Sequence, residues 1–295
     1  MKKTLFLLAV VSLFVSLASF AQAQDQSYSG PPKVIRIIRE GVKVGKGSAH
    51  ETNETAWARS FADAKSPDNW IGMDATSGNN EAWFVSGYAS MADMEKATIQ
   101  ALSTMPAVKA ADAKYSAQDG EFVSATRSVV AVYRDELSYQ GVKTNIGTFR
   151  YLYVTTVRIR PGHDADFVEA TKISRAAHEK AAVPERWSVF EVTEGMPRGT
   201  FFIFEPLKSM ADVDAFPQTH GKPYQDAVGD EGRKRLAELN SAATISAETN
   251  IFAFNPKMSN PTKEIAAADP GFWTPKPVKK AALGAKKGAE KPAGN

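Results

Sequence analysis

Along this chain the apolar positions alternate between the spacing of β-strands and the spacing of helices, and the same order of spacings occurs twice. Apolar positions partly alternate over 34–44 and again over 151–159, which predicts a β-strand in each run. Each run is followed by helical spacing, by two short apolar runs typical of a hairpin, by a second helical stretch and by a closing apolar run. We therefore predict two units of order β-α-β-β-α-β, over residues 33–137 and 149–255.

This order is that of the ferredoxin-like fold, an antiparallel four-stranded sheet with helices on one face. The fold class predicted is therefore α+β, with two tandem ferredoxin-like units. The second face of each sheet needs a cover, and two units in one chain can cover each other. The short link over 138–148, which contains Gly141, Asn145 and Gly147, favours such a shared interface.

Comparison of the chain with itself indicates that the two units are copies. Residues 46–78 align without gaps on 163–195. The matched pairs are Pro67 with Pro184, Trp70 with Trp187, Thr76 with Thr193, and Gly78 with Gly195. After a two-residue insertion, Ser90-Met91-Ala92-Asp93 falls on an identical Ser209-Met210-Ala211-Asp212. A serine three residues before an aspartate is typical of a helix start, so both copies predict a helix there.

One stretch of the second unit carries a resemblance to a known superfamily. Residues 157–167, Val-Arg-Ile-Arg-Pro-Gly-His-Asp-Ala-Asp-Phe, predict a strand that ends in Pro-Gly before an acidic helix start. With the duplicated pattern over about 33–255, the chain resembles the dimeric α/β barrel superfamily, which includes antibiotic-biosynthesis-monooxygenase-like, EthD-like and NIPSNAP-like domains. Two such units normally meet as a dimer, so the resemblance implies a dimeric α/β barrel built within one chain. It marks the fold and supplies no catalytic set.

The N-terminus has the three parts of a secretory signal peptide. Lys2 and Lys3 precede a largely apolar run over 5–20, and Ala21-Gln22-Ala23 offers a small-x-small cleavage site. We expect residues 1–23 to be a signal peptide and the protein to be exported, to a periplasm or to the medium, with a retained N-terminal anchor as the alternative.

The other end of the chain differs in composition from the two units. Residues 256–295 are rich in Pro, Lys, Ala and Gly, which predicts a disordered tail. From 274 onward this tail holds six lysines and one glutamate, so the net charge of +3 leaves the folded body mildly acidic. A mildly acidic body argues against nucleic-acid binding. The basic tail could weakly contact an anionic envelope polymer or lipid, although a solvated linker explains it more simply.

Several kinds of chemistry lack their usual residues. The chain has no cysteine, which excludes disulfides, thiolate metal sites and cysteine nucleophiles. The four histidines show no metal-ligand spacing and no H-E-x-x-H, so no metal site is expected. A G-x-S-x-G nucleophile elbow and a G-x-G-x-x-G phosphate loop are also missing from the sequence.

Two histidines lie on matched helices of the two units. Positions eleven apart lie on one helix face. That face carries His50, Trp57 and Phe61 in the first unit. In the second unit it carries Phe167, Ser174 and His178, so histidine and phenylalanine have exchanged ends. His50, Trp57 and His178 are therefore candidate ligand-binding residues, and a histidine at the edge of a core, bonded to a backbone carbonyl, is the simpler alternative.

A third histidine, His220, belongs to the polar break 217–224, which has no counterpart in the first unit. Loops on rigid scaffolds often carry function, so His220 and Tyr224 are also candidate ligand-binding residues. A histidine in such a place could act as a general base, a haem ligand or a gripping residue. The alternative is an ordinary surface histidine.

Three functions remain open at this point. The first is an exported protein that binds a small apolar or aromatic molecule, with no cofactor. The second, implied by the resemblance, is a cofactor-free or haem-dependent monooxygenase-like enzyme in which a histidine would ligate haem. The third is a structural or stress-related envelope protein attached through its basic tail. Whether the protein is an enzyme, and whether it is a monomer or a homodimer, is left open.

Overall fold

The computed structural model describes residues 30–141, 144–219 and 221–274, and within them eight strands form one closed antiparallel barrel. Their order around the barrel is β1-β3-β2-β8-β5-β7-β6-β4. The strands are β1 (Val34–Val42), β2 (Ile71–Ala75), β3 (Glu81–Tyr88), β4 (Val123–Tyr133), β5 (Tyr151–Ile159), β6 (Ser188–Glu194), β7 (Thr200–Leu207) and β8 (Thr244–Phe254).

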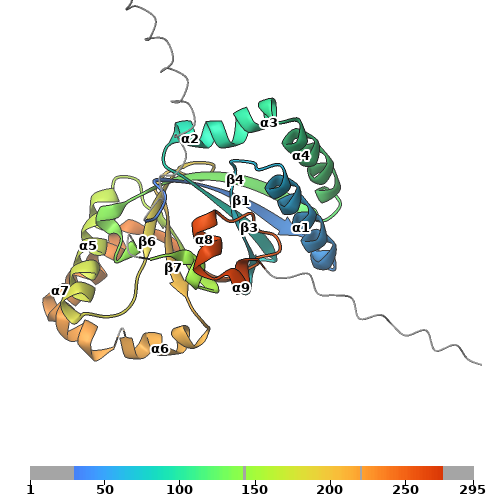
Figure 1. Ribbon diagram of the computed structural model, residues 1–295. Helices are drawn as coiled ribbons and strands as arrows, with labels where there is room; N and C mark the ends of the chain where they lie inside the picture. Colours follow the sequence, from blue (N-terminus) through green and yellow to red (C-terminus); the bar gives the residue numbers. More distant parts are fainter. Residues whose placement is uncertain (1–29, 142–143, 220, 275–295) are drawn as a thin grey trace, which may run out of the picture.

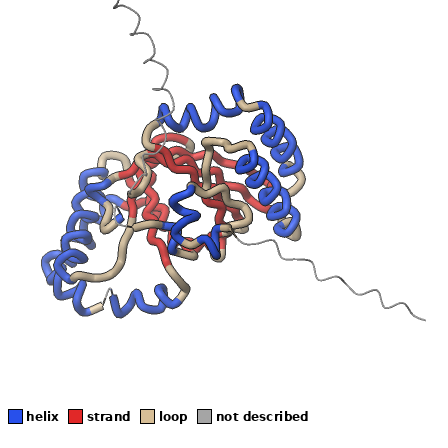
Figure 2. The backbone as a smooth tube through the Cα atoms, viewed as in Figure 1, coloured by secondary structure: helices blue, strands red, loops and turns tan. Residues whose placement is uncertain are grey.

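Helices cover the outside of the barrel, as Figures 1 and 2 show. In the first unit α1 (Gly47–Asp63) packs beside α4 (Pro106–Asp119), and in the second α5 (Asp164–Ala181) packs beside α7 (Lys222–Ala243) on the opposite side of the barrel (Figure 1). Shorter elements link these layers. They are α2 (Met91–Glu95), the π-helix Lys96–Gln100, α3 (Ala101–Thr104), the 3-10 turns Asp135–Leu137 and Ile146–Thr148, and α6 (Ala211–Thr219). In the part of the chain described, none of the helices has the length and apolar character needed to span a bilayer.

Strand pairs between the two units close the barrel. β2 pairs with β8, where Met73 is opposite Phe254, and β4 pairs with β6, where Tyr133 is opposite Phe190. The two units are therefore halves of a single sheet rather than two sheets in contact. The predicted α+β class and the intrachain barrel of two ferredoxin-like units are confirmed.

Alternation along each strand separates an interior core from two outer layers. On β1, Ile35 and Ile37 point into the barrel, where Trp83 packs against Phe202 and Phe252 with ring centroids 5.8 and 4.5 Å apart. Each such buried ring stabilises the fold by about 1.5–3 kcal/mol. The outer faces build separate cores beneath α1 and α4 and beneath α5 and α7.

The matched glycines lie where the hairpin of one unit meets a strand of the other. Gly78 and Gly195 have φ of 81° and 89°, in the left-handed region that favours glycine. A Cβ on Gly78 would lie 2.0 Å from Oδ1 of Asn250 on β8, and one on Gly195 would lie 2.1 Å from the Ser128 carbonyl oxygen on β4. The duplication therefore preserves a backbone requirement of the seam between units.

The matched Ser-x-x-Asp segments begin helical regions in both units, in different ways. In the first, the Ser90 hydroxyl accepts a hydrogen bond from the backbone N–H of Asp93, as a helix N-cap does. In the second, the aspartate side chain makes the hydrogen bonds instead: Oδ2 of Asp212 accepts from the backbone N–H groups of Lys208 and Ser209.

The segment after β8 is folded as far as residue 274. It contains α8 (Lys263–Ala268) and α9 (Pro270–Trp273) and packs against one end of the barrel. Met258 and Trp273 are buried, and the indole of Trp273 donates to the Gly147 carbonyl at 2.7 Å. The prediction of disorder from residue 256 is therefore wrong for 256–274, because single large apolar residues anchor a sequence whose average composition is polar. Residues 275–295, like the predicted signal peptide, lie outside the described residues.

Candidate functional site

A pocket of about 1320 Å³ opens at one end of the barrel. Strand ends from both units, the segment 30–32 and α8 surround it. Its floor consists of apolar side chains that point into the barrel. These are Ile35, Ile71, Met73, Val85, Leu152, Phe190, Phe204 and Phe254. The closed barrel thus keeps an apolar space at this end.

Polar groups are found at the rim of this barrel-end pocket. Lys96, Asn145 and Glu264 are exposed there. The Tyr133 ring packs on Phe190 with centroids 5.4 Å apart, and its hydroxyl donates to Asp135 at 3.4 Å. Burial raises the pKa of the Tyr133 hydroxyl, so this hydroxyl stays protonated at neutral pH. The pocket therefore offers an apolar interior with hydrogen-bonding groups at its entrance.

A second candidate site is a buried group of ionisable side chains on the outer face of the first unit. Glu40 on β1, His50 and Glu54 on α1, and Asp119 at the end of α4 converge there. We call these four residues the buried acidic cluster. His50 Nε2 lies 3.0 Å from Glu40 Oε2 and 3.7 Å from Asp119 Oδ1. The exposed fractions of the four residues are only 1–6%.

Local sequence places three of these side chains on one interface. Glu40 occupies the outward position of β1 between Ile38 and Val42, so it points at the helices that cover that face. His50 and Glu54 are four residues apart on the buried stripe of α1. The cluster therefore replaces apolar residues where a strand and a helix would normally pack.

Burial and mutual repulsion raise the pKa of two acids of the cluster. Burial, with repulsion from Glu40 and Asp119, raises the pKa of Glu54 to about 9. Burial, with repulsion from Glu40, raises the pKa of Asp119 to about 6, although the nearby His50 opposes the shift. Perturbed carboxyls of this kind are concentrated at functional sites.

Hydrogen bonding in the cluster leaves acceptors unused. The Asn53 side-chain N–H donates to the Tyr115 carbonyl at 3.1 Å and reaches Asp119 Oδ1 at 3.5 Å. Oε1 of Glu54 and Oδ1 of Asn53 are buried without a hydrogen-bond partner. Buried polar atoms nearly always have partners, so these two oxygens need an explanation.

The structure places the histidines predicted as candidates in different settings. His50 belongs to the buried acidic cluster. His178 is buried among aromatic rings, with Nδ1 2.7 Å from the Ser174 carbonyl, which matches the simpler alternative of a core-edge histidine. His220 lies outside the described residues.

The two aromatic candidates are packing residues in this structure. Trp57 stacks on Tyr115 across α1 and α4, with centroids 6.4 Å apart. Tyr224 lies against the His178 ring, with centroids 4.5 Å apart, and its hydroxyl is 3.2 Å from that of Ser174. His178 and Tyr224 are thus brought together. Among the described candidates, none lines the barrel-end pocket.

Sequence reasoning missed Glu40, Glu54 and Asp119. Two signals were available. Glu40 lies between Ile38 and Val42 in the outward row of β1, and Glu54 lies four residues from His50 in a stripe that continues to Ala58 and Phe61. Asp119 carries no such signal, because only the packing of α4 on α1 brings it to the site.

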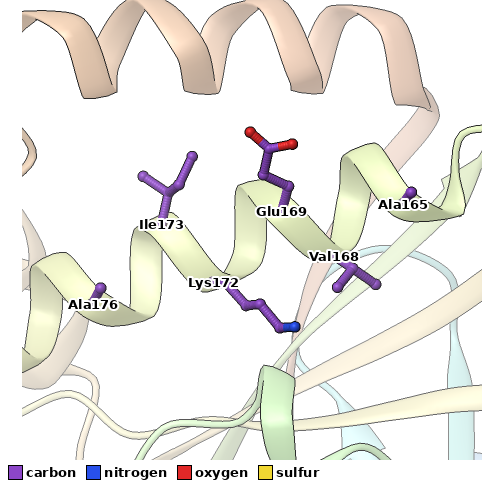
Figure 3. Close-up of a pocket in the computed structure, with 6 residues that line it drawn as sticks. All are labelled: Ala165, Val168, Glu169, Lys172, Ile173 and Ala176. Atoms are coloured by element: carbon purple, nitrogen blue, oxygen red, sulfur yellow. The ribbon is translucent and has the colours of Figure 1, made fainter.

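A further surface depression lies along α5 and is shown in Figure 3. Ala165, Val168, Lys172 and Ala176 are among its lining residues. Their side chains leave the helix in different directions (Figure 3), and Glu169 pairs instead with Arg235 of α7. No set of polar groups converges on this depression in the part of the chain described, so we do not treat it as a site.

Comparisons with known proteins bear on the fold. No family model and no curated protein sequence matches the chain. Among solved structures, a protein of Fusobacterium nucleatum subsp. nucleatum assigned as a monooxygenase aligns with a TM-score of 0.51 and 10% identity, over 76% of this chain and 93% of that one. The fold is the dimeric α/β barrel.

Two more solved structures align at lower scores. An anthrone oxidase-like protein aligns with a TM-score of 0.49 and 14% identity, over 75% of this chain and 91% of that one. A protein assigned as a chlorite dismutase aligns with a TM-score of 0.46 and 12% identity, over 80% of this chain and 98% of that one. Alignments at these scores carry no argument about this chain, so function must be argued from its own residues.

Proposed function

We propose that this protein is exported and binds a small apolar or aromatic molecule in the barrel-end pocket. The observation that carries the proposal is the pocket of about 1320 Å³ with an apolar floor and a polar rim. Pockets for small molecules are typically about 300–1,000 Å³ and mainly apolar, with a few polar groups that fix orientation. The space therefore suits a ligand of one to several rings.

Binding in this pocket would be driven by removal of apolar surface from water. The Phe190 and Phe204 rings and Met73 offer a floor for an aromatic body. The Tyr133 hydroxyl, together with Lys96 and Glu264 at the rim, would orient a polar substituent of the ligand. A hydroxylated aromatic compound has both features.

A binding role is better supported than the monooxygenase-like alternative. A cofactor-free oxidation requires a base near the ligand. The ionisable groups that line the pocket are the exposed Asp93, Lys96 and Glu264 and two tyrosines, Tyr88 and Tyr133, whose pKa burial raises. The described histidines at 50, 163 and 178 do not line the pocket. A haem in this pocket would therefore lack a histidine ligand from the described residues, and we derive no step through haem.

Ligand titrations of a pocket-filling variant test the proposal. Val85 lines the pocket and is only partly buried, so Val85→Trp would occupy its space. We expect 1-naphthol and 1-anilinonaphthalene-8-sulfonate to bind the unmodified protein saturably, and Val85→Trp to weaken binding by more than about tenfold, or about 1.4 kcal/mol. Fluorescence titration measures both affinities.

Val44→Trp is the matched control, because Val44 is 96% exposed and lies outside the pocket. It adds the same ring without filling the space and should leave affinity unchanged. Saturable binding that is equal in all three proteins would place the ligand elsewhere, and an absence of binding by the unmodified protein to a panel of such aromatics would reject the proposal.

A further inference from the structure

The buried acidic cluster holds more carboxyls than groups that can pair with them. It gathers three carboxyls and one imidazole, and its pairs are those of His50 with Glu40 and with Asp119. Within the described residues, neither a lysine nor an arginine forms an ion pair with Glu40, Glu54 or Asp119. Buried charges in proteins are normally paired or bound to metal ions.

Two buried side-chain oxygens, one in the cluster and one beside it, have no hydrogen-bond partner. Oε1 of Glu54, a residue only 4% exposed, has no hydrogen-bond partner, and neither has Oδ1 of Asn53. A buried oxygen of this kind is normally satisfied by a hydrogen-bond donor or by a positive ion, and these two contact neither. This observation is independent of the mere presence of acidic residues and points to a missing species at the same place.

The spacing of the donor atoms suits a single metal ion. One ligand atom from each of the four residues lies within 4.8 Å of all the others. The two distances from His50 Nε2, to Glu40 at 3.0 Å and to Asp119 at 3.7 Å, fall on either side of the separation of about 3.3 Å between ligands in a tetrahedral site with bonds of about 2.0–2.1 Å.

The chemistry of the donors selects the kind of ion. Mg²⁺ and Ca²⁺ prefer oxygen ligands alone, whereas a mixed imidazole and carboxylate set suits first-row transition metals and zinc. We propose that Glu40, His50, Glu54 and Asp119 bind one divalent ion of this class, Zn²⁺ or Mn²⁺, in the first unit. Asn53 is a positioning residue, since its N–H group contacts Asp119.

The second unit indicates that the fold itself does not need such a cluster. In the alignment of the two units, Glu40, His50 and Glu54 correspond to Val157, Phe167 and Thr171. There Phe167 packs on Phe201 with centroids 4.5 Å apart, and α5 still covers the sheet. The same scaffold is therefore built with an apolar filling, so the acids serve something other than packing.

The metal site is separate from the proposed ligand pocket. None of the four cluster residues lines the barrel-end pocket, and they lie beneath α1 on the outer face of the sheet. Loss of metal and loss of ligand binding can therefore be measured independently.

Metal content of refolded protein tests this inference. Untagged chain is unfolded with EDTA, refolded, equilibrated with Zn²⁺ or with Mn²⁺, passed over a desalting column and analysed by mass spectrometry for metal. We expect about one equivalent of bound ion per chain. Glu54→Gln keeps the shape and removes the carboxyl group that would ligate the ion, and it should weaken affinity by more than about tenfold.

Two further variants separate ligation from folding. Glu40→Val/His50→Phe/Glu54→Thr copies the filling of the second unit, and it should fold, by circular dichroism and urea unfolding, while retaining no metal. His178→Gln removes a buried histidine outside the cluster and should keep a full equivalent. Co²⁺ loading adds a visible absorption spectrum that should be lost in Glu54→Gln.

Opposite results would overturn the inference. If the unmodified chain retains no Zn²⁺ and no Mn²⁺ after refolding, the cluster is a set of protonated acids that are hydrated or strained. Full metal retention by the triple variant, or unchanged affinity in Glu54→Gln, would show that any bound ion lies at another place.

Discussion

The two units of this barrel use the same scaffold and fill it in opposite ways. Beneath α1 the first unit buries Glu40, His50 and Glu54, whereas beneath α5 the second buries Val157 and Phe167 at the matching places. Val123 pairs with Val42 and Thr244 with Ile159, so the closing strands match at an offset that places Asp119 opposite Asn240, which is exposed at the end of α7. The apolar filling of the second unit shows that the scaffold does not need buried acids at these places.

The largest expected effect comes from placing an acid of the first unit into the second. Val157→Glu introduces a carboxylate into an apolar layer in which Phe167 takes the place of His50. It should lower the free energy of unfolding by about 3–5 kcal/mol. Val157→Gln, which is polar without charge, should cost less. Urea denaturation of both variants at pH 7 measures the difference. A cost below about 1 kcal/mol for the glutamate would mean that the second unit accepts buried acids as readily as the first.

A smaller effect is expected at Glu205, an acid of the second unit whose counterpart in the first is Ser86. Burial, with repulsion from Glu185, raises the pKa of Glu205 to about 7 from an ordinary value of 4.5. The folded state thus holds a proton that the unfolded state has lost. Stability contributed by the protonated form is complete below about pH 4.5 and is lost as pH rises through 7.

Glu205→Gln should therefore be more stable than the unmodified protein at pH 8, by about 1–3 kcal/mol, and no more stable at pH 4.5. Urea unfolding at a series of pH values gives both curves. Parallel curves between pH 4.5 and 8 would show that Glu205 titrates normally.

The smallest effect is expected at the matched helix starts. The Ser90 hydroxyl caps its helix by accepting from Asp93, so Ser90→Ala should cost about 1 kcal/mol. In the described structure the Ser209 hydroxyl makes no hydrogen bond and Asp212 takes its place, so Ser209→Ala should cost only a few tenths of that. Thermal unfolding of the two variants side by side tests this. Equal losses would show that both serines cap alike.

Much of the fold was accessible from sequence because the signal repeats. Pairs such as Gly78 with Gly195, or Ser90 with Ser209, gain weight from their common register, and the strand and helix order follows from periodicity. The disorder predicted from residue 256 was wrong up to 274, because composition averages over a segment and overlooks single anchors such as Met258 and Trp273.

The candidate site was only partly predictable. His50 was selected for its helix face, but the absence of a metal site was predicted from the spacing of histidines alone. The cluster has one histidine with three carboxyls from separate elements. The expectation of no metal site thus rested on local spacing, and our proposal departs from it. The two candidates Trp57 and His178 share the periodicity of His50, and only their neighbours distinguish packing from chemistry.

The sequence by itself determined the duplication, the order of strands and helices in each unit, and which side chains face the helices, since all of these depend on neighbours along the chain. Tertiary structure alone decided that the two sheets join edge to edge, that the strand ends leave a pocket, and that Asp119 meets Glu40, a pair 79 positions apart. Such contacts depend on how strands and helices pack in space. Local periodicity relates only residues that are close along the chain, so it does not predict which distant residues meet across a barrel.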